Sequence, residues 1–185
     1  MLARKKLLRT CVVVATPLAV WTFLADRTAQ ALVIPLTFTE LTQRSKLILT
    51  GEVVNMRSYE APFQNAGDVF HTEVTIRVTK TLKGEAGGEE VKVLFLGGQI
   101  GDLWQKCPDA PKYKVGEKVL VFLREVKGGL WNTGWLQGKY TLDATGTKVQ
   151  GSEDLPIPRE MKLADVETSI QAVPPSTVEP SGGAR

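Results

Sequence analysis

Residues 118–126 (KVLVFLREV) constrain the fold more than any other part of the chain. Five apolar residues follow one another at the centre of this segment, without the polar residue at every second position that a half-exposed strand has. Such a run predicts a strand that faces water on neither side. The rest of the domain must therefore cover this strand from two directions.

The segments on either side of it also carry strand patterns. Residues 46–56 are rich in branched apolar side chains, and Gly51 within them predicts a bulge or bend. Residues 72–82 alternate between apolar and polar, as in a half-buried antiparallel strand. We expect further strands at residues 91–96, 130–136 and 139–142, and a turn at 143–146 that leads towards Val149.

A helix is predicted at each end of these strands. Thr37 and Glu40 have the spacing of a capping box, and the helix they begin should end near residue 44. Leu163, Val166 and Ile170 form one apolar stripe of a second helix, which Pro174 stops. Antiparallel strands between two helices indicate a mainly β domain, either a small barrel or a highly curved sheet.

The N-terminus has the three parts of a secretory signal peptide. Basic residues at positions 4, 5, 6 and 9 precede an apolar run at 11–25, and Ala29-Gln30-Ala31 has the small-residue pattern of a cleavage site. We expect residues 1–31 to be removed at Ala31, leaving one domain at 32–173 and a disordered tail at 174–185. The apolar run has 15 residues, fewer than the roughly 20 that span a bilayer. An uncleaved anchor in the inner membrane is the alternative.

Removing this segment changes the charge and the cysteine count. Residues 1–31 hold five of the 23 basic residues and one of the 20 acidic residues, so the remainder carries 18 and 19. A nucleic-acid partner is not expected, because such a domain would concentrate positive charge. Cys107 stays as a single cysteine and cannot form an internal disulfide. It is a packed apolar residue, a free thiol or half of an intermolecular bridge.

No group of residues has the composition of a catalytic or metal site. The single histidine, His71, begins an alternating strand, where a solvated or edge position is expected. With Cys107 it is too few for the three or four ligands of zinc, and the acidic residues lack the spacing of a calcium loop. We therefore predict no catalytic residue, no metal and no cofactor. A weak hydrolase using His71 or Cys107 remains an alternative.

Aromatic residues are the candidates for a binding surface. They are Trp104 and Tyr113 in the long irregular stretch 97–115, and Trp131 and Trp135, which would share a face of a regular strand. Their large apolar area permits two interpretations: core filling, or an exposed patch for a partner protein or a sugar. Trp104 is the best candidate for exposure.

Several segments carry a resemblance: LTQRSKLILTGEVV, TEVTIRVTKTLKG, VKVLFLGG, CPDAPKYKVGEKVLVFL and LQGKYTL. In this order they resemble an uncharacterised family of exported bacterial β-barrel proteins, over about residues 36–142. More distantly the chain is similar to netrin-like modules and tissue inhibitors of metalloproteinases. That resemblance implies a small antiparallel OB-like β-barrel. Those inhibitors use an N-terminal cysteine on the protease zinc, whereas residue 32 here is leucine.

Together these features predict an exported, non-enzymatic binding module of the bacterial envelope. We expect it to be a monomer in the periplasm or outside the cell, with a protein or an envelope polymer as its partner. An inhibitor or accessory domain of an exported protease is the second possibility.

Overall fold

The computed structural model describes residues 34–63, 67–126, 129–150 and 160–174. The predicted signal peptide with its cleavage site at Ala29 and Ala31 lies outside these residues, as does all of the predicted tail after Pro174. No helix in the described part of the chain is long and apolar enough to cross a membrane.

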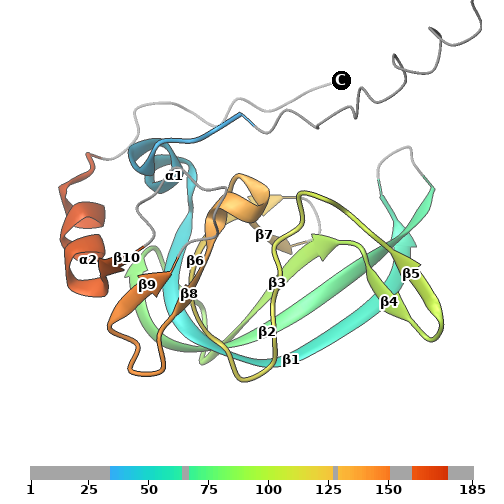
Figure 1. The fold of residues 1–185 in the computed structure, drawn as a ribbon. Helices are drawn as coiled ribbons and strands as arrows, with labels where there is room; N and C mark the ends of the chain where they lie inside the picture. The colour runs from blue at the N-terminus through green and yellow to red at the C-terminus, as the bar shows by residue number, and fades with distance from the viewer. Residues whose placement is uncertain (1–33, 64–66, 127–128, 151–159, 175–185) are drawn as a thin grey trace, which may run out of the picture. The chain divides into compact units, whose positions relative to one another are not determined.

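The described elements are mostly strands, with a helix before and after them (Figure 1). In chain order they are α1 (Phe38–Arg44), β1 (Leu47–Pro62), β2 (Asp68–Lys83), β3 (Glu90–Leu96), β4 (Gly98–Ile100), β5 (Leu103–Gln105), β6 (Lys118–Val126), β7 (Gly129–Asn132), the 3-10 turn η1 (Trp135–Gly138), β8 (Lys139–Leu142), β9 (Lys148–Gln150), β10 (Glu160–Lys162) and α2 (Leu163–Ala172). The mainly β class and the two flanking helices are confirmed.

Five strands of the main sheet form a ring. β1 pairs with β2, β2 with β3, β3 with β7, β7 with β6, and β6 pairs back with β1. These pairings are antiparallel except that between β3 and β7, which is parallel. The sheet continues outside the ring from β6 through β8 and β9 to β10. β4 and β5 form a separate two-stranded hairpin.

β6 is buried on both faces, as its sequence predicts. Val119, Val121 and Leu123 belong to the core inside the ring, together with side chains of β1, β2 and β3. Leu120 and Phe122 point to the other face. There they join a second core formed with α1, β8, β9 and α2, in which Phe122 contacts Phe38 and Tyr140 edge to face.

The local signals at the start of the domain are also confirmed. The Thr37 hydroxyl accepts a hydrogen bond from the Glu40 amide, and the Glu40 carboxylate accepts one from the Thr37 amide. The pairing of β1 with β2 shifts register between Thr50 and Gly51, where a bulge was expected. A Cβ at Gly51 would lie 2.4 Å from the Arg77 carbonyl oxygen, so the two backbones need glycine there.

Two predicted segments differ from the structure. Residues 130–136 are not one strand: β7 ends at Asn132, and Trp135 begins η1. The cause is the backbone, because Gly134 and Trp135 both have positive φ, +65° and +58°, which a strand does not have. The stretch 97–115 is not irregular throughout, since its first part is the β4–β5 hairpin.

The turn after β8 generates a prediction. Asp143 accepts hydrogen bonds from the Lys148 amide, the Thr145 hydroxyl and the Thr147 amide, which lower the pKa of its carboxyl from 3.8 to about 2. The ionised carboxyl therefore stabilises the folded state above its unfolded pKa, and this contribution is lost as the pH falls through about 2. We expect Asp143→Ala to lower the Tm at pH 7 and to leave it unchanged below pH 2, measured by thermal unfolding.

Asp102→Ala, which removes a carboxylate from another turn, is the control and should not share this pH profile. An Asp143→Ala effect of equal size at both pH values would contradict the role of the ionised carboxyl.

Candidate binding surface

The β4–β5 hairpin is fixed at its base to β2. The Gly97 amide donates to the Phe70 carbonyl (2.7 Å), and the Thr72 hydroxyl donates to the Gly97 carbonyl (2.7 Å). The Gln105 side chain accepts a hydrogen bond from the Phe70 amide. These bonds join both strands of the hairpin to one part of β2, so the hairpin is held in place.

Close packing at Gly98 strengthens this attachment. A Cβ at this position would lie 2.3 Å from the Thr72 hydroxyl oxygen and 2.5 Å from that of Ser58. Only glycine lets β4 approach β1 and β2 so closely, and Gly98 also has a φ of +136°. Figure 1 shows the hairpin beside the last part of β1 and the first part of β2.

The far part of the hairpin carries two exposed apolar side chains. Leu103 is 66% exposed and Trp104 is 65% exposed. They are neighbours on β5, opposite Ile100 and Gln99 of β4, and so point to opposite faces of the hairpin. Trp104 is the predicted site residue that the structure places most clearly in solvent.

Sequence reasoning missed Leu103 and the hairpin itself. Gly101-Asp102 stands between the short segments GQI and LWQ, and two residues of this type are a known hairpin signal. Because the segments have only three residues each, this signal is easily read as part of a loop.

Tyr113 is buried, which corrects its assignment to an exposed surface. It is 7% exposed and lies in the core of the ring, where it stacks on Phe95 with 6.0 Å between ring centroids. Its hydroxyl donates to the Asn132 side-chain oxygen (3.0 Å). Burial raises the pKa of Tyr113 above its ordinary value. The residue therefore fills the core and anchors the segment that leads into β6.

Trp131 is likewise buried, at 8% exposure, in a cluster of aromatic rings. His71 lies among Tyr59, Phe63 and Trp131, with ring centroids 5.7, 5.8 and 6.0 Å away. The histidine is only 5% exposed, so the expected solvated or edge position is wrong. Its Nδ1 is 3.1 Å from the Val69 carbonyl oxygen. Three aromatic rings thus pack against the imidazole.

Trp135 is half-buried and separate from Trp131. It is the first residue of η1. The residue after it, Leu136, donates a hydrogen bond from its amide to the Asp109 carbonyl (3.1 Å). The structure therefore does not unite the four predicted residues in one surface. Trp104 is exposed on the hairpin, Trp135 is partly exposed on another element, and Tyr113 and Trp131 are buried.

A largely buried ion pair, with side chains 11% and 14% exposed, joins the segment before β6 to β8. Lys139 pairs with Glu117, donates to the Thr141 hydroxyl (2.9 Å) and lies 5.4 Å from the centre of the Tyr113 ring. Burial lowers the pKa of Lys139, and the charge of Glu117 acts in the opposite direction. Both charged groups of this pair therefore make their contacts within the domain.

Gln137 makes a second long-range connection. Its side-chain oxygen accepts from the Leu36 amide (2.7 Å), and its side-chain nitrogen donates to the Ile34 carbonyl (3.2 Å). One buried amide thereby holds the chain just before α1 against η1. Gly138 follows it because a Cβ there would lie 2.4 Å from the Thr133 carbonyl oxygen.

The described residues do not bring a set of metal ligands together. Over those ranges no three His, Cys, Asp or Glu side chains gather as metal ligands. Cys107 is a free, partly buried thiol beside the hairpin base.

No family model matches the chain, and no curated protein matches it.

The buried ion pair gives a testable expectation. Glu117→Gln should destabilise the fold by about 3 kcal/mol, because it leaves the Lys139 ammonium buried without its counter-charge. The double variant Glu117→Gln/Lys139→Met removes both charges and should lose less stability than the sum of the losses in Glu117→Gln and Lys139→Met. Urea unfolding of the single and double variants measures this coupling. Additive losses would mean that the pair is not coupled in the folded state.

Proposed function

We propose that this chain is a non-enzymatic binding module that engages a protein partner through the β4–β5 hairpin. The observation that carries the proposal is the exposure of Leu103 and Trp104 on a hairpin whose base is fixed to β2. Tryptophan is enriched among the residues that dominate binding energy at protein interfaces. A fixed backbone also lowers the ordering cost that a flexible loop would incur on binding.

The charge of the domain supports a protein partner over a nucleic acid. Without residues 1–31 the chain carries 18 basic and 19 acidic residues, so it has no excess of positive charge for a polyanion. The hairpin itself contributes one carboxylate, Asp102, and no basic residue. Because Leu103 and Trp104 point to opposite faces of the hairpin, an apolar groove on the partner that contacts both faces is the match for them.

The proposal of a non-enzymatic role is supported by the positions of the two candidate residues. His71 is packed among aromatic rings, and within the described residues its ring nitrogen contacts the Val69 carbonyl and makes no hydrogen bond to an acid or a nucleophile. Cys107 packs against the backbone of the hairpin base. These surroundings favour binding over the weak hydrolase.

We further propose that the ring is an OB-type barrel, as the resemblance to netrin-like modules implies. Numbered along the chain, the five ring strands neighbour one another in the order first, second, third, fifth, fourth and first again. This order, with one parallel pair between the third and the fifth, is that of OB-type barrels and supports the proposal.

Capture of partners from an envelope extract tests the proposed surface. Exported protein carrying Trp104→Ala or Leu103→Ala should lose most of the captured partner, with a loss of about tenfold in affinity for the tryptophan variant. Ile34→Ala is the matched control, because Ile34 is also exposed but lies before α1.

Unchanged capture by both hairpin variants would refute this surface. Capture of an exported protease that loses activity on binding would instead identify the chain as an inhibitor or accessory domain of that protease.

Export is the remaining part of the proposal and has its own test. The basic, apolar and Ala29-Gln30-Ala31 segments support removal of residues 1–31 and release of a protein that begins at Leu32. We expect intact-mass measurement of the exported protein to give this N-terminus. Ala31→Leu should leave the signal attached, because a bulky residue does not fit the cleavage pattern. A wild-type chain that retains residues 1–31 in the membrane fraction would support the anchored alternative.

A further inference from the structure

The second half of β1 has a free edge. β6 pairs with β1 only as far as Glu52, and Val53 bonds to the residues just before β6. β2 pairs with β1 on the other side as far as Pro62. From Asn55 onward β1 therefore has a strand neighbour on one side alone among the described residues, and Figure 1 shows none along its other side.

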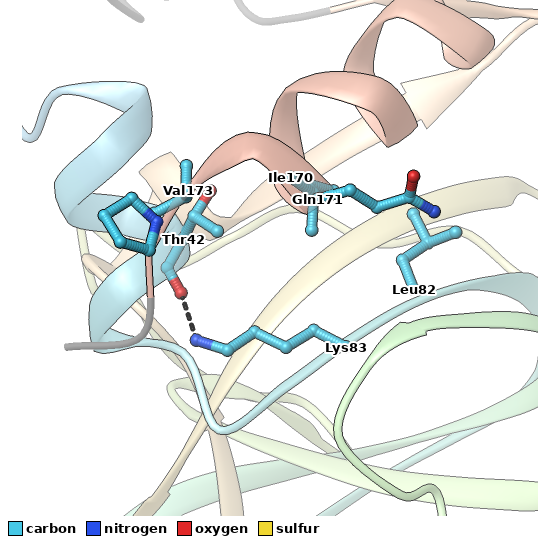
Figure 2. Close-up of a pocket in the computed structure, with 7 residues that line it drawn as sticks. Thr42, Leu82, Lys83, Ile170, Gln171 and Val173 are labelled. Carbon is cyan, nitrogen blue, oxygen red and sulfur yellow. Dashed lines mark hydrogen bonds between the residues drawn. The ribbon is translucent and has the colours of Figure 1, made fainter.

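The corresponding stretch at the end of β2 is covered by helices. β2 continues past Arg77, where its pairing with β3 ends. There Lys80 pairs with Glu167 of α2 (2.7 Å), and Lys83 donates to the Thr42 carbonyl of α1 (2.6 Å), as Figure 2 shows. Figure 1 shows both helices at the opposite end of the domain from the second half of β1. The edge of β1 has no such cover.

The strand register shows which backbone groups point outward at this edge. The amide and carbonyl of Phe70 in β2 bond to Gln105 and Gly97, so they point away from β1. Glu60 lies opposite Phe70, and opposed residues of an antiparallel pair orient alike, so its amide and carbonyl point away from β2. Ser58 has the same orientation because the pattern repeats every second residue. These outward groups have no backbone partner among the described residues.

Both ends of this stretch are closed. The outward amide of Met56 donates to the side-chain oxygen of Asn55 (2.9 Å). Pro62, the outward residue at the other end, has no amide hydrogen. Exposed edges are commonly blocked in such ways, yet Ser58 and Glu60 between them keep both their amides and their carbonyls free. An extended segment of about five residues fits this window, since every second residue of a strand faces its neighbour.

The hairpin lies over one face of the edge. Gly98 packs on the hydroxyls of Ser58 and Thr72, which are cross-strand partners. A side chain of an added strand opposite Ser58 would point to this same face. There it would lie near Met56, which is partly buried against the core of the ring, and near the hairpin that carries Trp104. Apolar residues are therefore favoured at alternate positions of the added segment.

Arg57 defines the other face of the edge. It is exposed and lies opposite Glu73 of β2, whose carboxylate pairs with Lys92 of β3 (2.9 Å). The sign of the charge thus alternates from β1 to β3. An acidic residue opposite Arg57 would continue this alternation as a favourable cross-strand pair.

We propose that the protein partner adds an extended segment to β1 as an antiparallel strand, with backbone hydrogen bonds to Ser58 and Glu60. The proposal rests on the proposed function for the kind of partner and assigns its segment a chemistry: apolar residues at alternate positions, with an acidic residue between two of them. Another peptide backbone is the group that matches amides and carbonyls at strand spacing. Pairing with β2 already holds this edge in place, which lowers the cost of ordering it on binding.

Amide hydrogen exchange of the exported protein, followed by NMR, tests the edge itself. We expect the amides of Ser58 and Glu60 to exchange faster than those of Arg57 and Tyr59, which face β2. Slow exchange at Ser58 and Glu60 in the free protein would overturn the proposal. Protection that grows with protein concentration would also overturn it, because a second copy would then occupy the edge.

The acetylated and amidated peptide VTVEV is the probe for strand addition. With its central valine opposite Ser58, its glutamate lies opposite Arg57, and we expect it to slow exchange at Ser58 and Glu60. N-methylation of the central valine removes an amide hydrogen that faces β1 and should weaken binding by about tenfold. N-methylation of the threonine, whose amide faces away, is the matched control and should leave binding unchanged.

Variants of the protein test the same geometry. Glu60→Pro removes an outward amide without breaking a bond to β2 and should weaken VTVEV binding by about fivefold, whereas Glu60→Ala keeps that amide and should bind like the wild type. Should Glu60→Pro fail to fold, Arg57→Glu remains informative. It should reverse the preference, so that VTVKV binds better than VTVEV.

Three results with the peptide would overturn strand addition: no protection of Ser58 and Glu60, equal losses for the two N-methylated peptides, or an unchanged preference in Arg57→Glu. Trp104→Ala separates this proposal from that of the hairpin. Protection by VTVEV that survives Trp104→Ala unchanged would support strand addition and count against the hairpin. Partner capture that depends on Trp104 without protection of Ser58 and Glu60 would support the hairpin and overturn strand addition.

Discussion

Burial of β6 on both faces is the constraint on which the rest of the structure depends. One face of the strand completes the core inside the ring, and the other forms the floor of the second core under α1, β8, β9 and α2. A strand with Val119, Val121 and Leu123 on one side and Leu120 and Phe122 on the other is stable only when both layers are present. The ring and the outer layer are therefore one folding unit, joined by a shared strand.

Buried polar contacts then fix how the connecting segments lie on this framework. The segment before β6 is held through Tyr113 and Glu117, and the segment before α1 through Gln137. These residues belong to the sequence motifs on which the family resemblance rests. Their roles here are structural, because Tyr113 and Gln137 are buried, Glu117 is largely buried, and each is bonded within the domain. Motifs of this kind report the fold and leave function to the exposed parts of the surface, such as the hairpin.

Patterns with a strong local cause were predictable from the sequence. The capping box at Thr37 and Glu40, the bulge at Gly51 and the double burial of β6 each follow from a few neighbouring residues. The site was less predictable, because exposure of an aromatic ring depends on distant segments. Trp104 and Trp131 look alike in sequence, yet one is exposed on the hairpin and the other contacts the rings of Phe63, just after β1, and His71 of β2.

The Gln137 contact also affects when the domain can assemble. Leu36 and Gln137 are separated by 101 positions, so their hydrogen bond cannot form until nearly the whole domain is available. For the export proposed above, a chain entering a translocation channel N-terminus first would carry Leu36 through long before Gln137 follows. Late closure of this kind would postpone complete folding until most of the domain has passed.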